Sequence, residues 1–183
     1  MYPWLRLTRV VIGLIGRAPL DPFTTTCVRV RVWPNDLDFN LHVNNGRYLT
    51  LADLGRIHWF ARTGILCRAR RQRALPMVGD AIARFRRDLR AFQTFEIHTR
   101  LIGWDEKWGF LEHRFVRGGR VIGVVAVRGL FKGPSGPVEP GGLFGGDQAR
   151  ASPPLPDWAN RFDQSSELMS EMLRAEERSQ GLR

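Results

Sequence analysis

The polar segment at residues 36–48 reads Asp36-Leu37-Asp38-Phe39-Asn40-Leu41-His42-Val43-Asn44-Asn45-Gly46-Arg47-Tyr48. It contains two acids, three Asn and one His, which is denser than a surface loop requires. Before it, Val28, Val30 and Val32 alternate with arginines, and this pattern predicts a half-buried strand. After it, apolar residues recur at helical spacing. We therefore interpret residues 36–48 as a polar site between a strand and a helix.

The helix expected after this site covers residues 47–66, which contain no Pro, and Gly64 is its natural stop. Its apolar face is broad, so the helix should be buried on more than one side. Four strand-like segments follow, separated by turn-forming residues: 81–91, 95–101, 110–116 and 121–131. This order predicts an α+β fold with an antiparallel sheet curled around the helix. A plain α+β sandwich is the alternative.

Three parts are expected along the 183 residues: an N-terminal arm or amphipathic helix (1–24), a main domain (25–135), and a linker with a C-terminal helix (136–183). Residues 133–156 are half Gly and Pro, which predicts a flexible or irregular segment. Residues 158–178 predict a helix that docks through one apolar stripe. The stripe consists of Leu168, Met169, Met172 and Leu173.

Residues 4–17 are apolar but interrupted by Arg6, Arg9 and Arg17, which is not the pattern of a signal peptide. We expect them to pack on the domain or on a partner subunit. Contact with a membrane surface is the alternative. No apolar run approaches the about 18 residues of a membrane span.

The formal net charge of +10 comes almost wholly from Arg, which supplies all but two of the 28 basic residues. This charge indicates an anionic partner: a phosphorylated ligand, nucleic acid or a membrane surface. No helix-turn-helix, zinc finger or RNA-binding aromatic pattern occurs, which argues against nucleic acid. The Gly-rich run at residues 141–146 lacks a following Lys-Ser/Thr, so it is no P-loop, and no GxSxG motif exists.

Cys27 and Cys67 are the only cysteines, so a disulfide framework is not expected and a reducing, cytoplasmic location is. The four His and two Cys show no close paired spacing such as HxxxH or CxxC. We therefore expect no metal site and no cofactor.

The start of the helix after residue 44 offers unpaired backbone N–H groups and the positive end of a helix dipole. Such an end can polarise a carbonyl, and an upstream carboxylate can attack that carbonyl or deprotonate a water. In an extended backbone, Asp38, Asn40 and His42 would share one face. The pattern suits hydrolysis of an activated acyl group.

Simpler roles are open for several of these side chains. Asp36 is more typical of a turn or capping acid, and Asn44 or Asn45 is a natural helix cap. Tyr48 has the position of a helix core residue. Asp53 is followed by Arg56 at i+3, so an ion pair is the default interpretation and a second functional carboxylate the alternative.

The string Asp36-Leu37-Asp38-x-Asn40-x-His42-Val43-Asn44-Asn45-x-x-Tyr48 resembles the hallmark segment of the hotdog-fold acyl thioesterases. These are 4-hydroxybenzoyl-CoA-thioesterase-like proteins, and the similarity is greatest to acyl-ACP thioesterases and the thioesterase superfamily member 6 group. The resemblance covers about residues 26–132. It implies a hotdog fold, in which an antiparallel sheet wraps a long central helix, and a homodimer or dimer of dimers.

The resemblance also implies roles for individual residues. Asp38 matches the catalytic acid, acting as nucleophile or general base, and Asn40 and His42 match catalytic residues that position the acid or the water. The implied substrate-binding set surrounds the start of the helix: Asn44, Asn45, Gly46 and Tyr48.

The implied function is thioester hydrolysis of acyl-CoA or acyl-ACP, and a non-catalytic acyl-binding or membrane-associated hotdog protein is the alternative. The sequence shows no clear counterpart to the additional acid that acyl-ACP enzymes carry after the helix. Asp80 is near that position but is not assigned to it. Another branch of the fold uses a carboxylate on the central helix, which Asp53 could supply.

Overall fold

The structure is a computed structural model that describes residues 3–145 and 150–181. The helices are α1 (Trp4–Ile12), α2 (Asn45–Arg62), α3 (Ile65–Arg71), α4 (Pro140–Phe144) and α5 (Asp157–Ser179), and a 3-10 helix spans Pro34–Asp36. The strands are β1 (Thr26–Arg31), β2 (Leu75–Phe85), β3 (Thr94–Trp104), β4 (Gly109–Arg117), β5 (Arg120–Gly133) and β6 (Gly136–Pro137).

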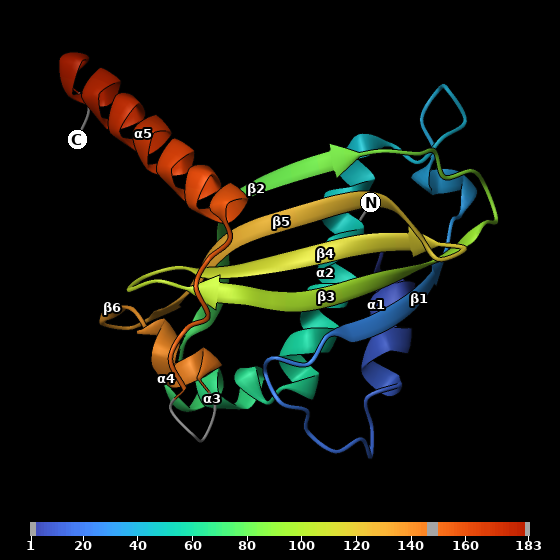
Figure 1. The fold of residues 1–183 in the computed structure, drawn as a ribbon, viewed down its shortest axis with the longest axis horizontal. Coiled ribbons are helices and arrows are strands. Elements are labelled where there is room, and N and C mark those ends of the chain that lie inside the picture. Colours follow the sequence, from blue (N-terminus) through green and yellow to red (C-terminus); the bar gives the residue numbers. More distant parts are fainter. Residues whose placement is uncertain (1–2, 146–149, 182–183) are drawn as a thin grey trace.

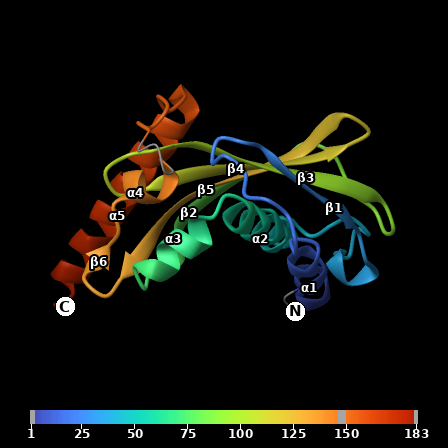
Figure 2. The ribbon, with the colours of Figure 1, turned by 90° about the horizontal axis from the view of Figure 1, so that it is seen from below.

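One antiparallel sheet forms the body of the molecule, with the strand order β1-β3-β4-β5-β2 and β6 paired to β5 (Figure 1). The sheet arches over α2 (Figure 2). Helices α1 and α3 lie on either side of α2, on the same face of the sheet. The predicted α+β fold with a sheet curled around a central helix is therefore confirmed.

The core lies between α2 and the concave face of the sheet. Leu51, Leu54 and Trp59 of α2 are fully buried in the same cluster as Ile97 of β3 and Phe115 of β4. Gly55 allows α2 to approach β3 closely, because a Cβ at this position would lie 2.4 Å from the hydroxyl oxygen of Thr99. Tight packing on several sides explains why the apolar face of α2 is broad.

The boundaries of two predicted elements differ from the structure. Residues 65–71, expected as a basic connector, form α3, and the left-handed conformation of Gly64 (φ 72°) separates it from α2. Strand β2 runs from residue 75 to 85 rather than from 81 to 91. It ends there because the backbone N–H groups of Arg86 and Arg87 both donate to the carbonyl of Ile122, which stops the ladder.

The Gly/Pro-rich segment is not simply an irregular tail. Its residues 136–145 contain β6 and α4, and the side chains of Leu143 and Phe144 are buried in the main core. The Phe144 ring packs near Trp59, Trp104 and Phe131. Two apolar anchors among many glycines, Leu143 and Phe144, fix this segment on the core, and the expectation of an irregular tail did not include them. Residues 146–149 lie outside the described part of the chain.

The predicted C-terminal helix is confirmed as α5, but the expected docking stripe is wrong. Leu168, Met169, Met172 and Leu173 are all exposed. Docking occurs through the first turns instead, where Ala159 is buried beside Ile102 and Phe110 in a separate small cluster. The remainder of α5 extends away from the body (Figure 1).

A buried arginine ties these first turns of α5 to the sheet. The guanidinium of Arg128 on β5 forms ion pairs with Asp163 and Glu167 of α5 and with Asp80 of β2. It also lies 4.4 Å from the ring centre of Trp108.

None of the described helices is long and apolar enough to cross a membrane.

Candidate active site

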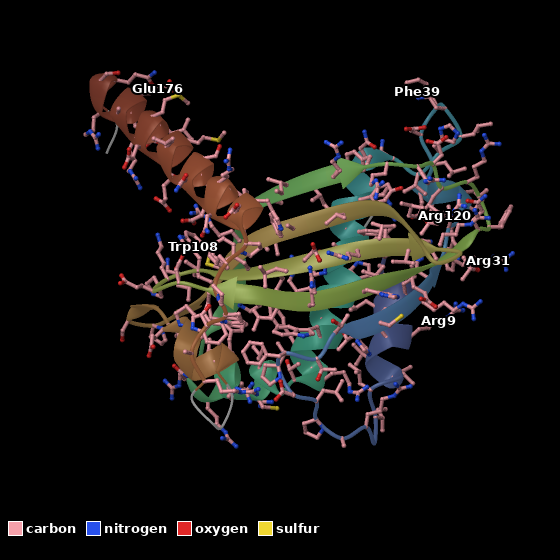
Figure 3. The ribbon with its side chains drawn as sticks, viewed as in Figure 1. Arg9, Arg31, Phe39, Trp108, Arg120 and Glu176 are labelled. Carbon is pink, nitrogen blue, oxygen red and sulfur yellow. The ribbon has the colours of Figure 1, made fainter. Side chains whose placement is uncertain are left out.

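The polar loop ahead of α2 is a tight turn rather than an extended strand. Leu37 and Val43 form an antiparallel bridge, and the Leu41 N–H donates to the Asp38 carbonyl at 3.0 Å. Leu41 has a positive φ of 58°, which closes the turn. The expectation that Asp38, Asn40 and His42 share one face of an extended backbone is therefore wrong. Phe39, 93% exposed, stands at the tip of this loop (Figure 3).

Asp36 is a structural acid. Its carboxylate is 1% exposed and accepts hydrogen bonds from the guanidinium groups of Arg6 (2.9 Å) and Arg47 (2.8 Å) and from the Trp33 N–H (2.8 Å). Burial opposes ionisation, but these donors outweigh it and hold the pKa of Asp36 below its ordinary value. The turn or capping interpretation of Asp36 agrees with this geometry.

Asp38 is only partly buried and has a different environment. Its carboxylate accepts one hydrogen bond, from the backbone N–H of Asn40 at 2.9 Å. The Asp38 N–H donates to the His42 carbonyl at 2.9 Å, which fixes the backbone at the base of the turn. No other donor among the described residues bonds to this carboxylate. Asp38 therefore keeps acceptor capacity for a water or a substrate.

The other two predicted catalytic residues do not bond to Asp38 in this conformation. The Asn40 side chain is exposed, and the Nε2 atom of His42 lies 3.5 Å from a carboxylate oxygen of Asp88 in the loop after β2. Their catalytic roles stay predictions.

The start of α2 has the predicted cap. The Asn44 side chain accepts from the Gly46 N–H at 2.8 Å, and the Asn44 carbonyl accepts from the Arg47 N–H at 2.9 Å. Asn45 and Gly46 are exposed, and the Asn45 N–H has no acceptor within the described parts of the chain. A donor at the positive end of a helix is suited to binding a polarised carbonyl oxygen.

Tyr48 lies in the aromatic core rather than on the loop surface. It is 3% exposed, and its ring contacts Phe85 and Phe115 edge-on at centroid distances of 5.0 and 4.9 Å. Burial, aided by the charge of Asp88, raises the pKa of its hydroxyl to about 12. The core interpretation of Tyr48 is confirmed, and its place in the substrate-binding set stays a prediction.

The Asp53 carboxylate is paired with the Arg56 guanidinium, as its sequence position indicated. Both residues line a cavity of about 240 Å³ between α2 and β2, together with Phe60, Met77 and Phe131. The size and lining of this cavity could not be predicted from the sequence, because they depend on how far β2 lies from α2. Asp80 is bound to Arg128, which gives this acid a structural partner.

Three side chains that can ligate metals meet on the outer face of β1 and β3. The ligand atoms of Cys27, Glu96 and His98 lie within 4.8 Å of one another, and the His98 Nε2 is 2.9 Å from Glu96. The prediction of no metal site relied on spacing along the chain, which does not detect ligands brought together across paired strands. This cluster shares no residue with the loop site at residues 36–48.

Comparison with known proteins identifies the family. Residues 32–162 match the model of the thioesterase-like superfamily. The chain belongs to this superfamily. Protein THEM6 of Danio rerio is 41% identical over 114 residues, covering 62% of this chain and 56% of the relative. Thioesterase poxG of Penicillium oxalicum is 28% identical over 124 residues, covering 60% and 40%. The chain spans about half the length of the THEM6 proteins it matches.

Solved structures show the same fold. A probable thioesterase from Bartonella henselae has a TM-score of 0.57 and 20% identity, covering 63% of this chain and 98% of that one. A gentisyl-coenzyme A thioesterase has a TM-score of 0.55 and 21% identity, covering 62% and 92%. The resemblance to hotdog-fold thioesterases, drawn from residues 36–48, is confirmed.

Proposed function

We propose that this protein hydrolyses the thioester of an acyl-CoA or acyl-ACP, with Asp38 as the nucleophile or general base. The observation that carries the proposal is the position of Asp38 in the turn just ahead of α2, with one hydrogen bond to its carboxylate. The membership of the thioesterase-like superfamily supports the reaction class.

The reaction needs a polarised carbonyl and an oxygen nucleophile. In our proposal the thioester carbonyl lies against the backbone N–H groups of Asn45 and Gly46, where the helix dipole stabilises the developing oxyanion. The Gly46 N–H already donates to the Asn44 side chain, so Asn45 is the readier donor. In one route the Asp38 carboxylate attacks the carbonyl carbon, the C–S bond breaks to release the thiolate, and water hydrolyses the resulting acyl-enzyme anhydride. In the other route Asp38 removes a proton from a water that attacks the carbonyl and displaces the thiolate. The products are the free acid and the thiol.

We further propose that the protein acts as a homodimer, or a dimer of dimers, through β2. This strand is the last in the sheet, and all its residues except the half-buried Asp80 are exposed. An open edge strand offers unpaired backbone groups to a second sheet. Its exposed apolar side chains support the same pairing: Leu75, Met77, Val78, Ile82 and Phe85. A partner at this edge would cover the cavity beside Asp53 and make it an acyl pocket.

The carrier would be held by arginines that follow the same edge. Arg84, Arg86, Arg87 and Arg90 are exposed at the end of β2 and in the loop after it. That loop lies next to the polar turn: a carboxylate oxygen of Asp88 is 3.5 Å from the Nε2 atom of His42. Guanidinium groups bind phosphate oxygens in bidentate fashion, and both CoA and an acyl carrier protein present phosphate and other anionic groups.

The test is release of free thiol by purified wild-type protein and by Asp38→Asn, across acyl-CoAs from short aliphatic to aromatic and then acyl-ACPs. We expect turnover by the wild type and a loss of about 10²-fold or more in the variant, the scale of general-base catalysis. Asp157→Asn is the matched control, because this acid is exposed at the start of α5. Equal turnover by wild type and Asp38→Asn would refute the role of Asp38. Binding of acyl-CoA without any hydrolysis would favour a non-catalytic acyl-binding protein.

A further inference from the structure

The outward face of α1 is apolar although it is exposed. The helix packs on the body through Leu7 and Val10. The opposite face and the turn after the helix carry five large exposed side chains, of which Ile15 is 79% exposed: Trp4, Leu5, Val11, Ile12 and Ile15. No acid occurs between residues 3 and 20. Amphipathic helices with large apolar residues and flanking arginines are typical of proteins that lie in a membrane interface.

A basic pocket opens beside this face. A cavity of about 260 Å³ lies between α1, β1 and α2, and none of the described residues that line it is acidic. Its lining includes Arg9, Arg17, Arg29 and Arg31, and Arg9 and Arg31 lie on the same side of the molecule (Figure 3). Arg9 follows Leu5 by four residues and precedes Ile12 by three, so it borders the apolar face.

The pocket has cationic groups available for an anion. Within the described residues, Arg9 and Arg17 form no hydrogen bond or ion pair through their guanidinium groups. Arg6, which also lines the pocket, is neutralised by Asp36, and Arg31 donates to the carbonyl of Phe92. Arg29, the remaining arginine of the lining, lies close enough to Glu96 to contribute, after His98, to lowering the pKa of that carboxyl. Arg9 and Arg17 are therefore available to a phosphate-sized anion.

A buried imidazole belongs to the lining of the same pocket. His58 of α2 is 9% exposed, and its Nδ1 atom has no hydrogen-bond partner within the described residues. Burial, followed by the charges of Arg62 and Arg17, lowers the pKa of His58 to about 4. The ring is therefore neutral near pH 7. A buried polar atom that lacks a partner needs an explanation, and here it belongs to a side chain that lines a basic pocket.

We propose that α1 and this pocket form a docking surface for an anionic membrane. The apolar face of α1 enters the boundary between headgroups and acyl chains, and the pocket receives the phosphate of one lipid headgroup. The arginines at its rim meet the negative surface potential of the bilayer. The proposal is independent of the thioesterase activity.

A second copy of the chain fits this face less well. A two-fold contact places the same basic patch, which lacks acids, on both sides of the interface, so arginines of both subunits would be brought together. Opposed cations without acids between them repel, whereas anionic lipid neutralises both groups. Charge complementarity therefore favours the membrane.

The first experiment is co-sedimentation of the full chain with vesicles of phosphatidylcholine alone and of phosphatidylcholine mixed with phosphatidylglycerol. We expect binding to the mixed vesicles to be at least about tenfold stronger, and to weaken as salt screens the arginines. No binding to the mixed vesicles, or equal binding to both kinds, would overturn the proposal.

Paired variants locate the surface. Ile12→Glu with Ile15→Glu should abolish vesicle binding, and Arg9→Gln with Arg17→Gln should remove the preference for anionic lipid. Met169→Glu with Met172→Glu is the matched control, because it places two acids on the exposed apolar stripe of α5. Retained binding by the α1 variant, or an equal loss in the α5 control, would refute the assignment. A thermal unfolding midpoint equal to that of the wild type shows that each variant is folded.

Tryptophan fluorescence tests the docking face on the wild-type protein itself, so the result does not depend on whether a charged variant folds. Trp4 is exposed on the proposed docking face. Brominated lipid in the mixed vesicles should quench part of the tryptophan fluorescence of the wild type, and this part should be missing in Trp4→Phe. Identical quenching of the two proteins would show that the α1 face does not enter the lipid. If the Ile12/Ile15 variant changes the oligomeric state in light scattering and vesicles bind neither protein, the occupant is a second copy.

Discussion

Asp36 and Asp38 stand two residues apart in the same loop, and the structure gives them opposite environments. Asp36 is buried between two guanidinium groups and a backbone N–H, while Asp38 lies in a solvent-facing turn with one backbone donor. The difference comes from the backbone. The 3-10 helix turns Asp36 inward toward α1 and α2, and the turn closed by Leu41 holds Asp38 outside.

Within one motif, Asp36 is expected to serve stability and Asp38 chemistry. Asp36 joins three elements, because Arg6 belongs to α1 and Arg47 to α2 while Asp36 itself ends the 3-10 helix. Asp38 joins nothing beyond its own turn. We therefore expect substitutions of Asp36 to act mainly on the free energy of unfolding, and substitutions of Asp38 to act mainly on turnover.

The largest expected effect on stability is that of Asp36→Ala. Removing the carboxylate leaves the charge of Arg6 buried without its acid, and breaking a buried ion pair in this way costs about 3–5 kcal/mol. Urea unfolding followed by circular dichroism measures the change, with Asp157→Ala as the exposed control. A loss no larger than that of the control would mean that Asp36 does not hold the loop to the two helices.

A smaller, pH-dependent effect sharpens the same contrast. Because the pKa of Asp36 in the folded protein lies below its ordinary value of 3.8, its ionised form stabilises the fold. This contribution is fully present above pH 3.8 and is lost as the pH falls through the folded-state pKa. The stability difference between wild type and Asp36→Asn should therefore be constant near neutral pH and shrink in acid. Urea unfolding at a series of pH values measures it, and a difference that is unchanged at low pH would contradict the assignment.

The sequence predicted the fold well because its patterns are local. The alternation of Val28, Val30 and Val32 with arginines follows the burial of β1, and the broad apolar face of residues 47–66 matches α2. The cap at Asn44 could also be predicted, because an Asn side chain just before a helix accepts a hydrogen bond from an unpaired backbone N–H of the first turn. These features depend on neighbours a few residues away.

The errors arose where distant contacts decide the structure. Phe144 draws a Gly-rich segment into the core through contacts with Trp59 and Trp104, which no local pattern reveals. The stripe of α5 looked like a docking face, but Arg128 and Ala159 anchor the helix by its first turns instead. The error in the site has a local cause instead: the positive φ of Leu41 closes a turn, so the side chains of the loop do not alternate as in an extended chain.

The smallest expected effect on stability is that of Asp38→Asn, and it is the most decisive for the comparison. The amide keeps an oxygen that can accept from the Asn40 N–H, so the turn should be retained. Substitutions of partly exposed residues without tertiary partners change the free energy of unfolding by about 0.5 kcal/mol or less. The same substitution removes the negative charge and basicity that attack on a thioester requires. Unfolding in urea, measured on the protein samples used for the thiol-release assay, should therefore show an intact fold beside lost turnover. A destabilisation as large as that of Asp36→Ala would make Asp38 a second structural acid, and the loss of turnover would then report on folding rather than on chemistry.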